Sequence, residues 1–225
     1  MTFSIAARCA TTGQLGIAIS SSSIAVGARC PWLHPGVGAV ASQNITLPAL
    51  GPEILGLIAQ GYSPQQALDN AMVQHAYSDY RQVTCIDHLG RTAHFSGSHT
   101  LGVSNALKGE QCVAAGNMLS DPRVIKVMVE EFETVQGHLA DRLLAAMRAG
   151  QRLGGEAGPV HSAALKIVGD VEWPIVDLRV DWADTDPITA LGLLWEAYHP
   201  QLQDYIDRAL EPTKAPGYGV PGDDR

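Results

Sequence analysis

The 225-residue sequence lacks the charge pattern of a nucleic-acid-binding protein. Its 15 lysines and arginines form no basic run, and 23 acidic residues give a formal net charge of −8. Such a surface has nothing with which to follow a phosphate backbone. The N-terminus has no basic stretch before an apolar segment, and nowhere do eighteen apolar residues run together. We therefore expect a cytoplasmic protein with no nucleic acid and no membrane among its partners.

Motifs for metals and cofactors are also missing. The four cysteines, Cys9, Cys30, Cys85 and Cys112, form no CxxC pair, which excludes a zinc knuckle and predicts buried thiols. The histidines at positions 88, 94 and 99 have a spacing that suits neither one helix face nor one strand face. The chain has no HExxH, no Walker loop, no GxGxxG after a strand and no GxSxG elbow. We expect no metal and no cofactor.

What is present is the composition of a globular protein, with 46% hydrophobic residues and scattered charges. No composition shift divides the chain before its end, so we expect one domain over residues 1–210. The Pro/Gly-rich segment 211–225 follows as a C-terminal arm. Because Tyr218 and Val220 are apolar enough to anchor it, we expect this arm to pack on a neighbouring subunit of a homo-oligomer. A solvated extension is the alternative.

Hydrophobic periodicity and turn signals divide the domain into strands and helices, and Ser63, Asp121 and Asp186 are the capping residues predicted at helix starts. Strands are predicted over residues 2–8, 15–20, 37–42, 80–87, 91–95, 111–115, 162–168 and 175–180, and helices over 53–60, from 63 onward, and over 121–134, 138–151, 186–198 and 201–210. Glycine and alanine dominate the second and third strands, which indicates burial on both faces. Helices come in adjacent pairs between groups of strands, which favours antiparallel sheets covered by helices. The predicted fold is α+β, a four-layer α-β-β-α sandwich.

Thr2 is the first candidate catalytic residue. Removal of Met1 would leave a threonine hydroxyl and a free α-amine on one residue, which is a nucleophile with its own base. An α-amine with a pKa of roughly 7.7–8.0 is partly neutral at physiological pH. The alternative is that Thr2 only starts an edge strand.

Seven motifs follow one another between residue 2 and about residue 190. They are Thr2-Phe3-Ser4-Ile5, Ala25-Val26-Gly27, Gly36 to Gln43, Tyr80-Arg81-Gln82, Gly116 to Leu119, Ser162 to Leu165 and Val176 to Asp181. Together they resemble an uncharacterised bacterial family of unknown function, placed by its fold among the N-terminal nucleophile hydrolases. The resemblance implies the same four-layer sandwich, with Thr2 as the nucleophile and its amine as the base.

The function expected from this resemblance is hydrolysis of a C–N bond in a small amide, imide, lactam or ureide, through an acyl-enzyme at Thr2. The substrate is then a small molecule. Two alternatives stay open: a catalytically inactive sandwich that serves in binding or assembly, and an isomerase or cyclase that uses the Thr2 amine as a base.

Asn117 is the candidate for stabilising an oxyanion. Its loop, Gly116-Asn117-Met118, resembles the proteasomal strand-to-helix loop that contributes a serine beside the nucleophile. A side-chain amide there has an N–H to donate to a developing negative charge. The alternative is a turn residue with positive φ, which asparagine tolerates.

Six further residues are candidates for substrate binding, at the predicted ends of strands and in the late loop. They are Ser21, Ser22, Gln43, Asn44, Glu156 and His161. Alternate serines of the run 20–23 would point toward Thr2, and Glu156 would orient the amine. Near Gln43 and Asn44 the proteasome keeps a lysine that is absent here, so electrostatic help must come from neutral amides or from Arg29. For each, the alternative is ordinary hydrogen bonding at a strand end or a solvated loop.

Asp177, Arg179 and Asp181 alternate along the last strand and point to one face. This spacing predicts a surface ladder of ion pairs more strongly than a site.

Overall fold

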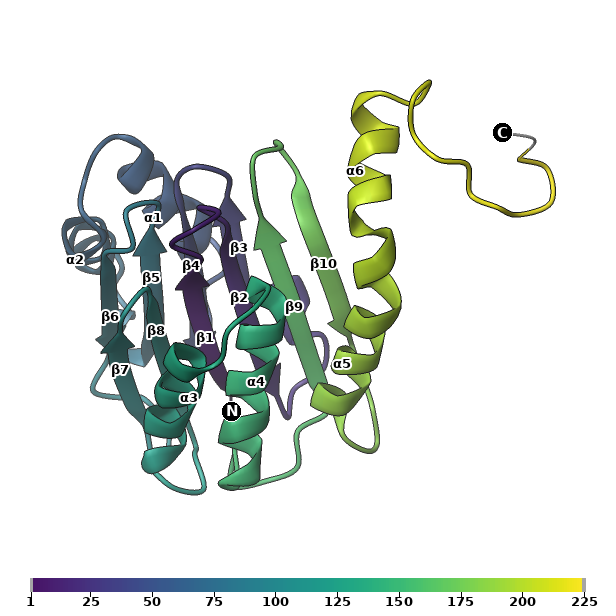
Figure 1. Cartoon of the computed structure of the whole chain (residues 1–225). Coiled ribbons are helices and arrows are strands. Elements are labelled where there is room, and N and C mark those ends of the chain that lie inside the picture. Colours follow the sequence, from purple (N-terminus) through teal and green to yellow (C-terminus); the bar gives the residue numbers. More distant parts are fainter. Residues whose placement is uncertain (1, 224–225) are drawn as a thin grey trace.

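The structure, a computed structural model, describes residues 2–223. Its strands are β1 (Thr2–Arg8), β2 (Leu15–Ser21), β3 (Pro31–His34), β4 (Gly38–Asn44), β5 (Arg81–Asp87), β6 (Thr92–Ser96), β7 (Asn105–Gly109), β8 (Cys112–Asn117), β9 (Ser162–Val168) and β10 (Pro174–Val180). Its α-helices are α1 (Leu50–Ala59), α2 (Pro64–Gln74), α3 (Arg123–Thr134), α4 (Leu139–Arg152), α5 (Pro187–Tyr198) and α6 (Leu202–Leu210). Figure 1 shows how they are arranged.

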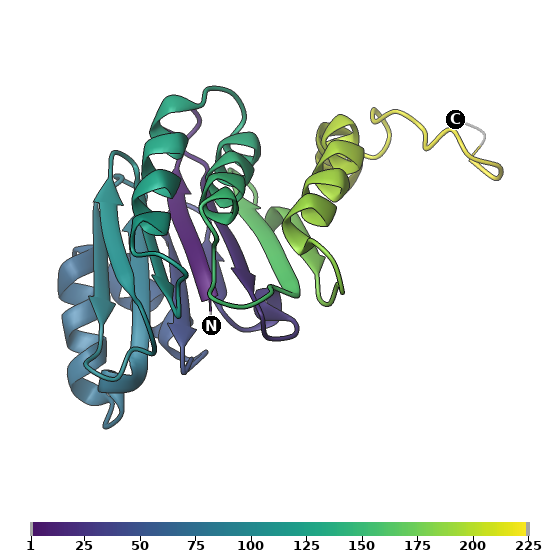
Figure 2. The same ribbon diagram turned by 90° about the horizontal axis from the view of Figure 1, so that it is seen from below.

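The strands form two antiparallel sheets. The larger has the order β10-β9-β2-β1-β8-β7, and the smaller has the order β3-β4-β5-β6. Helices α3, α4 and α5 cover the outer face of the larger sheet, while α1 and α2 cover the smaller one, as Figure 2 shows end-on. The predicted α-β-β-α sandwich is therefore confirmed. No helix within residues 2–223 is long and apolar enough to cross a membrane.

Successive side chains of β1 point to opposite faces of the larger sheet, so they belong to two different hydrophobic cores. Phe3 and Ile5 pack with α3 and α4, whereas Ala6 packs between the sheets. A third core lies between the smaller sheet and helices α1 and α2. Every residue of β2 is buried, as its small side chains predicted. Thr2 and Ser4 share the parity of Ala6, so β1 presents both hydroxyls to the space between the sheets.

Gly116 lets β8 lie close against β1 and α3. A Cβ at this position would stand 3.2 Å from the Cβ of Phe3 and 2.7 Å from a methyl group of Leu119. Both neighbours are fully packed, so a larger residue would force the backbone to move. This close fit positions the next residue, Asn117, beside the start of β1.

Two of the predicted capping residues, Ser63 and Asp186, are confirmed at helix starts. Ser63 and Gln66 form a capping box at α2, and the carboxylate of Asp186 accepts the backbone N–H groups of Ile188 and Thr189 at α5. Asp121 is different: Pro122 is the N-cap of α3 and makes no side-chain cap bond. The Asp121 carboxylate instead pairs with the guanidinium of Arg123 and accepts its backbone N–H at 2.7 Å. Helix α1 begins three residues earlier than predicted, at Leu50.

Two strands were missed by the sequence prediction, β3 and β7. Each lies at the edge of its sheet. Strand β3 begins with a proline, and β7 has no buried residue and exposes both Leu107 and Lys108. Edge strands need neither burial on both faces nor a full set of backbone donors, so their sequences carry a weak signal.

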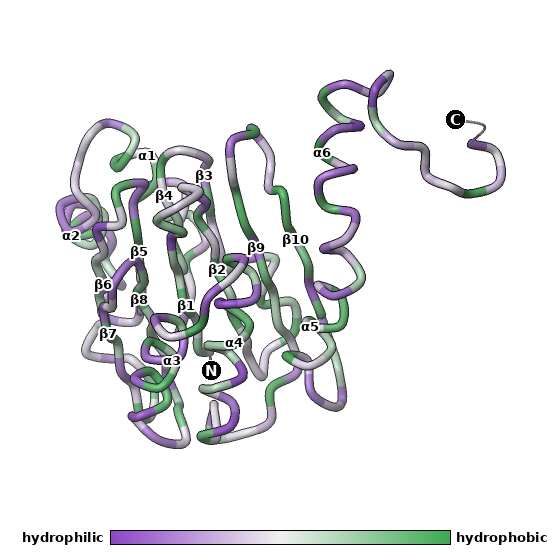
Figure 3. Tube along the Cα trace, in the orientation of Figure 1, coloured by the Kyte–Doolittle hydropathy of each residue, from purple (hydrophilic) through white to green (hydrophobic). Residues whose placement is uncertain are grey.

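The C-terminal segment 211–223 leaves the body of the sandwich after α6, as Figure 1 shows. Figure 3 shows hydrophilic and hydrophobic residues alternating along α6 before the tail. The guanidinium of Arg208 donates to the carbonyls of Pro216 and Gly217 and lies 4.1 Å from the ring centroid of Tyr218. Tyr218 and Val220 are both more than half exposed. The predicted packing of this arm on a neighbouring subunit stays a prediction.

The remaining local predictions have clear outcomes. All four cysteines are free and buried. On β10, the carboxylate of Asp177 lies 3.6 Å from the guanidinium of Arg179, which confirms that part of the predicted ladder, and 3.2 Å from the ammonium of Lys166 on β9. Asp181, the third predicted member, forms no ion pair within residues 2–223. Met1, whose removal the nucleophile hypothesis requires, lies outside the described residues.

Candidate active site

Antiparallel pairing brings several predicted residues to one end of the sandwich. Thr2 begins β1, and its strand neighbours β2 and β8 end beside it at Ser21 and Asn117. Thr2 and Asn117 are register partners, so their side chains lie on the same face with Cβ atoms about 4.5–5.5 Å apart. The N-terminal end of β1 marks this place in Figure 1. Thr2 is 4% exposed, which places its hydroxyl between the sheets.

A serine–arginine chain, made of Thr2, Ser21, Ser23 and Arg29, extends from this hydroxyl. The Oγ1 of Thr2 donates to the Oγ of Ser21 at 3.3 Å. The hydroxyls of Ser21 and Ser23 are 2.8 Å apart, and the Nη2 of Arg29 donates to the Ser23 Oγ at 2.8 Å. Three hydrogen bonds thus link Thr2 to a positive charge.

An amide network, made of Ser4, Gln43, Gln82 and Asn117, spans the space between the sheets on the other side of Thr2. The Ser4 hydroxyl donates to Gln43 Oε1 at 2.7 Å, and Gln43 Nε2 donates to Gln82 Oε1 at 2.8 Å. Asn117 Nδ2 donates to the same Gln82 oxygen at 3.0 Å. All four residues are buried.

One backbone carbonyl fixes the orientation of every amide in this network. The carbonyl oxygen of Gly116 can only accept, so the Gln82 group 3.1 Å from it must be the Nε2 donor. Gln82 Oε1 then faces Gln43 and Asn117, and both must present their nitrogens to it. The Oδ1 of Asn117 is left buried, with no hydrogen-bond partner among residues 2–223. Among the described residues, only one hydrogen of its Nδ2 has an acceptor, and the other can bind a further one.

Asn117 is the last residue of β8 and not a turn residue. The positive φ in this loop, 49°, belongs to Met118. The Met118 N–H donates to the carbonyl of Leu101, and its carbonyl accepts from the N–H of Ala157. A methionine in this conformation is uncommon and is held by the loops on both sides. The loop therefore keeps the Asn117 side chain directed between the sheets.

Glu156 lies behind the serine run. Its carboxylate accepts the backbone N–H of Ser22 at 3.2 Å and 3.3 Å, and its backbone pairs with that of Leu119. The residue is 4% exposed, and burial raises its pKa from 4.5 to about 7 despite the hydrogen bonds from Ser22, which act in the opposite direction. A carboxyl group that titrates near neutrality can exchange a proton at physiological pH.

A cavity of about 280 Å³ opens beside Glu156. Its wall includes Phe3, Gln151, Pro159 and Asp186. The Gln151 amide donates to the Asp186 carboxylate at 2.8 Å, and the Glu156 carboxylate accepts from the backbone of Ser22. Within residues 2–223, neither acid is paired with a lysine or arginine side chain. The volume of the cavity lies just below the range of about 300–1,000 Å³ that is usual for small-molecule sites.

The other predicted binding residues have structural roles in the described chain. His161 donates its backbone N–H to the Ser21 carbonyl, and its ring stacks on Trp182 with centroids 4.3 Å apart. Asn44, with φ of 69°, donates to the Tyr80 carbonyl at 2.7 Å and accepts the N–H of Leu101. Asn44 thus fixes loops next to the site, while Gln43 turns into the amide network. Ser22 contributes its backbone N–H.

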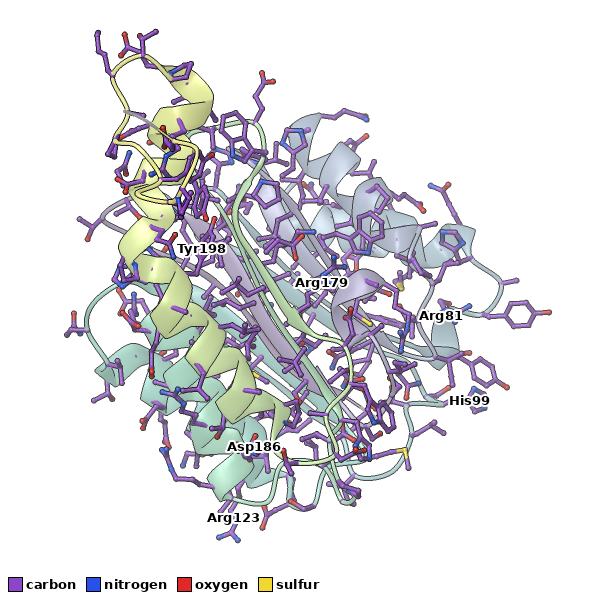
Figure 4. The ribbon with its side chains drawn as sticks, turned by 90° about the vertical axis from the view of Figure 1, so that its right-hand side faces the viewer. Arg81, His99, Arg123, Arg179, Asp186 and Tyr198 are labelled. Atoms are coloured by element: carbon purple, nitrogen blue, oxygen red, sulfur yellow. The ribbon has the colours of Figure 1, made fainter. Side chains whose placement is uncertain are left out.

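A second cavity lies next to the smaller sheet, near Asn44. A cavity of about 220 Å³ there is lined by Ile45, Tyr77, Tyr80 and Arg81. Tyr80 stacks on His99 with ring centroids 4.6 Å apart, and Figure 4 shows Arg81 and His99 on this side of the molecule. An aromatic wall with a guanidinium suits a planar or anionic part of a small molecule.

Sequence reasoning named no site role for Ser4 or Gln82, and it considered Ser23 only as part of the serine run 20–23. Gln82 is the register partner of Gln43 on the next strand, so two amides stand side by side where alternation would place apolar residues. Two buried glutamines at the same end of neighbouring strands are the signal that the sequence offered, but their pairing requires the register to be known.

Comparisons with known proteins place the chain in a family. A family model, described as a family of unknown function (DUF1028), matches residues 2–191. The crystal structure of a Silicibacter pomeroyi protein with the same family label is 32% identical, with a TM-score of 0.84, and the match covers 92% of this chain and 93% of that one. No curated protein matches the chain.

More distant solved structures include Anbu (ancestral beta-subunit) from Yersinia bercovieri, which is 13% identical with a TM-score of 0.44, over 97% of this chain and 100% of that one. Anbu from Hyphomicrobium sp. strain MC1 is 14% identical with a TM-score of 0.44, over 97% and 100% of the two chains.

Proposed function

Since this chain belongs to DUF1028, a family of unknown function, we propose its activity from its own site: it is an N-terminal nucleophile hydrolase that cleaves a C–N bond of a small amide, imide, lactam or ureide. The observation that supports this most strongly is the position of Thr2. Its hydroxyl lies between the sheets, bonded to Ser21 and paired in register with Asn117.

The chemistry requires that the chain is cut before Thr2. The freed α-amine then takes the proton of Oγ1 as this oxygen attacks the substrate carbonyl. An Oγ–carbon bond forms, and the C–N bond breaks as the amine returns the proton to the leaving nitrogen. Water then attacks the acyl-enzyme by the same route. Each step needs a base beside the hydroxyl and a donor for the oxyanion.

Asn117 suits the second of these needs. Gln82 occupies one hydrogen of its Nδ2, and the other is available to an oxyanion. Its Oδ1, which is buried without a partner among the described residues, is an acceptor for the protonated amine. Glu156, whose pKa is about 7, would help to orient that amine and set its charge.

The experiment compares two preparations of the wild-type chain, one with a homogeneous Thr2 N-terminus and one that retains Met1, each verified by intact mass. Both are assayed on the same panel of small amides, imides, lactams and ureides. We expect turnover only from the first, because an amide nitrogen at Thr2 has no useful basicity. Equal rates from both preparations would sink the N-terminal nucleophile mechanism. Isomerised or cyclised product without hydrolysis would support the use of the amine as a base alone.

A further inference from the structure

We propose that Arg29 is a positioning residue for Thr2, and that it stabilises the negative charge developing on Thr2 Oγ1 through Ser23 and Ser21. This inference rests on the proposed function, because it concerns the same nucleophile. It assigns the electrostatic role to a guanidinium that does not contact the substrate.

The guanidinium of Arg29 is held in place by neutral acceptors. Its Nη1 donates to the carbonyls of Ile24 at 2.6 Å and Ala25 at 3.0 Å, and its Nη2 donates to Ser23 Oγ at 2.8 Å. Within the described chain, Arg29 forms no ion pair. Its charge is therefore not cancelled by a carboxylate, and it acts on the hydroxyl to which it donates.

The backbone around Arg29 is fixed from outside. Ala25 has φ of 53°, a left-handed conformation that turns its carbonyl toward the guanidinium, and its N–H donates to the carbonyl of Asp181. Ser162 closes the same turn, since its hydroxyl donates to the Ser23 carbonyl at 2.6 Å and accepts the N–H of Val26 at 3.2 Å. The first residue of β9 and the residue that follows β10 thus hold the turn that presents Arg29 to Ser23.

The order of donors along the chain suits a nucleophile that loses its proton. Before attack, Thr2 donates to Ser21, and Ser21 Oγ also accepts the backbone N–H of Ser23 at 3.1 Å. When the Thr2 proton moves to the amine, rotation of two hydroxyls reverses the chain. Arg29 then donates to Ser23, Ser23 to Ser21, and Ser21 to the Thr2 oxygen. No heavy atom has to move, and each bond polarises the next.

Other charged groups surround this segment, and they act in different directions. Glu156 accepts the N–H of Ser22, and its ionised form would oppose negative charge on Thr2. His161 contacts the chain through its backbone N–H on the Ser21 carbonyl. On β10, Arg179 packs beside Gly27, but its guanidinium lies 3.6 Å from the Asp177 carboxylate, which offsets its charge. Arg29 is the cation of this group that is bonded to the hydroxyl chain.

The test measures the nucleophilicity of Thr2 directly, with a β-lactone as the probe. Thr2 Oγ1 attacks the lactone carbonyl, the Oγ–carbon bond forms and the ring C–O bond breaks. The hydroxyl proton passes to the α-amine and then to the released ring oxygen, which stays on the acyl group as an alcohol. The protein gains the full mass of the lactone, and peptide mass spectrometry locates it at Thr2. All preparations carry Thr2 at the N-terminus.

Arg29→Met removes the charge and keeps the length of the side chain. We expect it to slow trapping by about tenfold to thirtyfold, the effect of one unit charge at roughly 8 Å in a medium of effective dielectric constant about 20. Ser23→Ala should give a smaller loss, because it breaks the hydrogen-bonded link but leaves the charge of Arg29 in place. Arg29→Lys loses the fork of hydrogen bonds but keeps the charge, so it should react several-fold faster than Arg29→Met. Arg123→Met, which removes an exposed guanidinium paired with Asp121, is the matched control and should react like the wild type.

Each outcome bears on the proposal. Equal trapping of wild type and Arg29→Met overturns it and leaves the proposed function intact. Equal rates for the Lys and Met variants also overturn it, since a purely structural role depends on the fork and not on the charge. Failure of the wild type to be trapped at Thr2 overturns both proposals. Thermal unfolding of each variant shows whether it is folded when assayed.

Discussion

The amide network and the serine–arginine chain lie on two sides of Thr2, and they are built in opposite ways. The amide network is neutral and fully buried, and the carbonyl of Gly116 fixes its orientation. The serine–arginine chain runs toward the half-buried Arg29 and carries its charge. Neutral amides can be buried without the large cost of desolvating an ion, whereas a guanidinium needs contact with solvent or many acceptors. Fixed geometry therefore comes from one side of Thr2 and electrostatic potential from the other.

Thr2→Ala removes the hydroxyl that is bonded to Ser21 and whose residue is paired in register with Asn117, so we expect the largest effect of any substitution. Turnover of a small amide should be lost, because alanine supplies no nucleophile, while Thr2→Ser should retain part of it. The measurement is kcat/KM for preparations whose N-terminal residue is residue 2 in each case. Equal activity of wild type and Thr2→Ala would remove Thr2 from the mechanism.

Asn117→Ala disrupts the amide network and leaves the serine–arginine chain unchanged. If Asn117 donates to the oxyanion, kcat should fall by roughly 10²–10³ with little change in KM. Gln82→Met, which leaves Asn117 in place but frees its amide to rotate, should give a smaller loss of kcat. Ser96→Ala is the matched control, since it removes a hydrogen bond to Gln82 Nε2 without touching Asn117. A rise in KM alone would make Asn117 a residue that binds the ground state.

Glu156→Gln tests the carboxyl group next to the serine–arginine chain, through the pH dependence of the free energy of unfolding. The folded-state pKa of Glu156 is about 7 against 4.5 for the free group, so between these values the folded protein binds a proton that the unfolded chain releases. Wild-type stability therefore falls as pH rises from about 4.5 to 7, and the loss persists above pH 7. Glutamine carries no proton equilibrium and should lack this fall.

We compare the free energy of unfolding of Glu156→Gln with that of the wild type at each pH. The difference between the two proteins should shift in favour of the variant by on the order of 3 kcal/mol between pH 4 and pH 8. Urea unfolding at both pH values measures it. An identical pH dependence of stability in the two proteins would show that the carboxyl titrates near its ordinary pKa when folded.

Deletion of the chain after Leu210 changes neither the amide network nor the serine–arginine chain, so we expect it to have the smallest effect on activity. If the arm packs on a neighbouring subunit, its loss should lower the sedimentation coefficient and the melting temperature while kcat stays unchanged. Analytical ultracentrifugation and thermal unfolding of the shortened chain are the measurements. The idea of an arm fails if both values match those of the full chain.

The sequence by itself determined most of the elements and their grouping. Period-two alternation located β1, capping residues at Ser63 and Asp186 located the starts of α2 and α5, and pairs of helices indicated two covered sheets. These signals are local, because they depend on residues a few positions apart. The edge strands β3 and β7 escaped, since an exposed edge imposes little on side-chain type.

Thr2 and Asn117 were predicted as candidates one by one, from the chemistry of each residue. Only the tertiary structure decided that they are register partners, that Gln82 orients Asn117, and that Ser23 joins Arg29 to Thr2. The raised pKa of Glu156 likewise depends on its burial in the folded protein. The role of Asn44 in fixing the neighbouring loop through the Tyr80 carbonyl also became visible only in the structure. Register and burial depend on residues that are far apart in the chain, because each hydrogen bond and each desolvated group needs a partner brought by another strand. No local pattern carries that information.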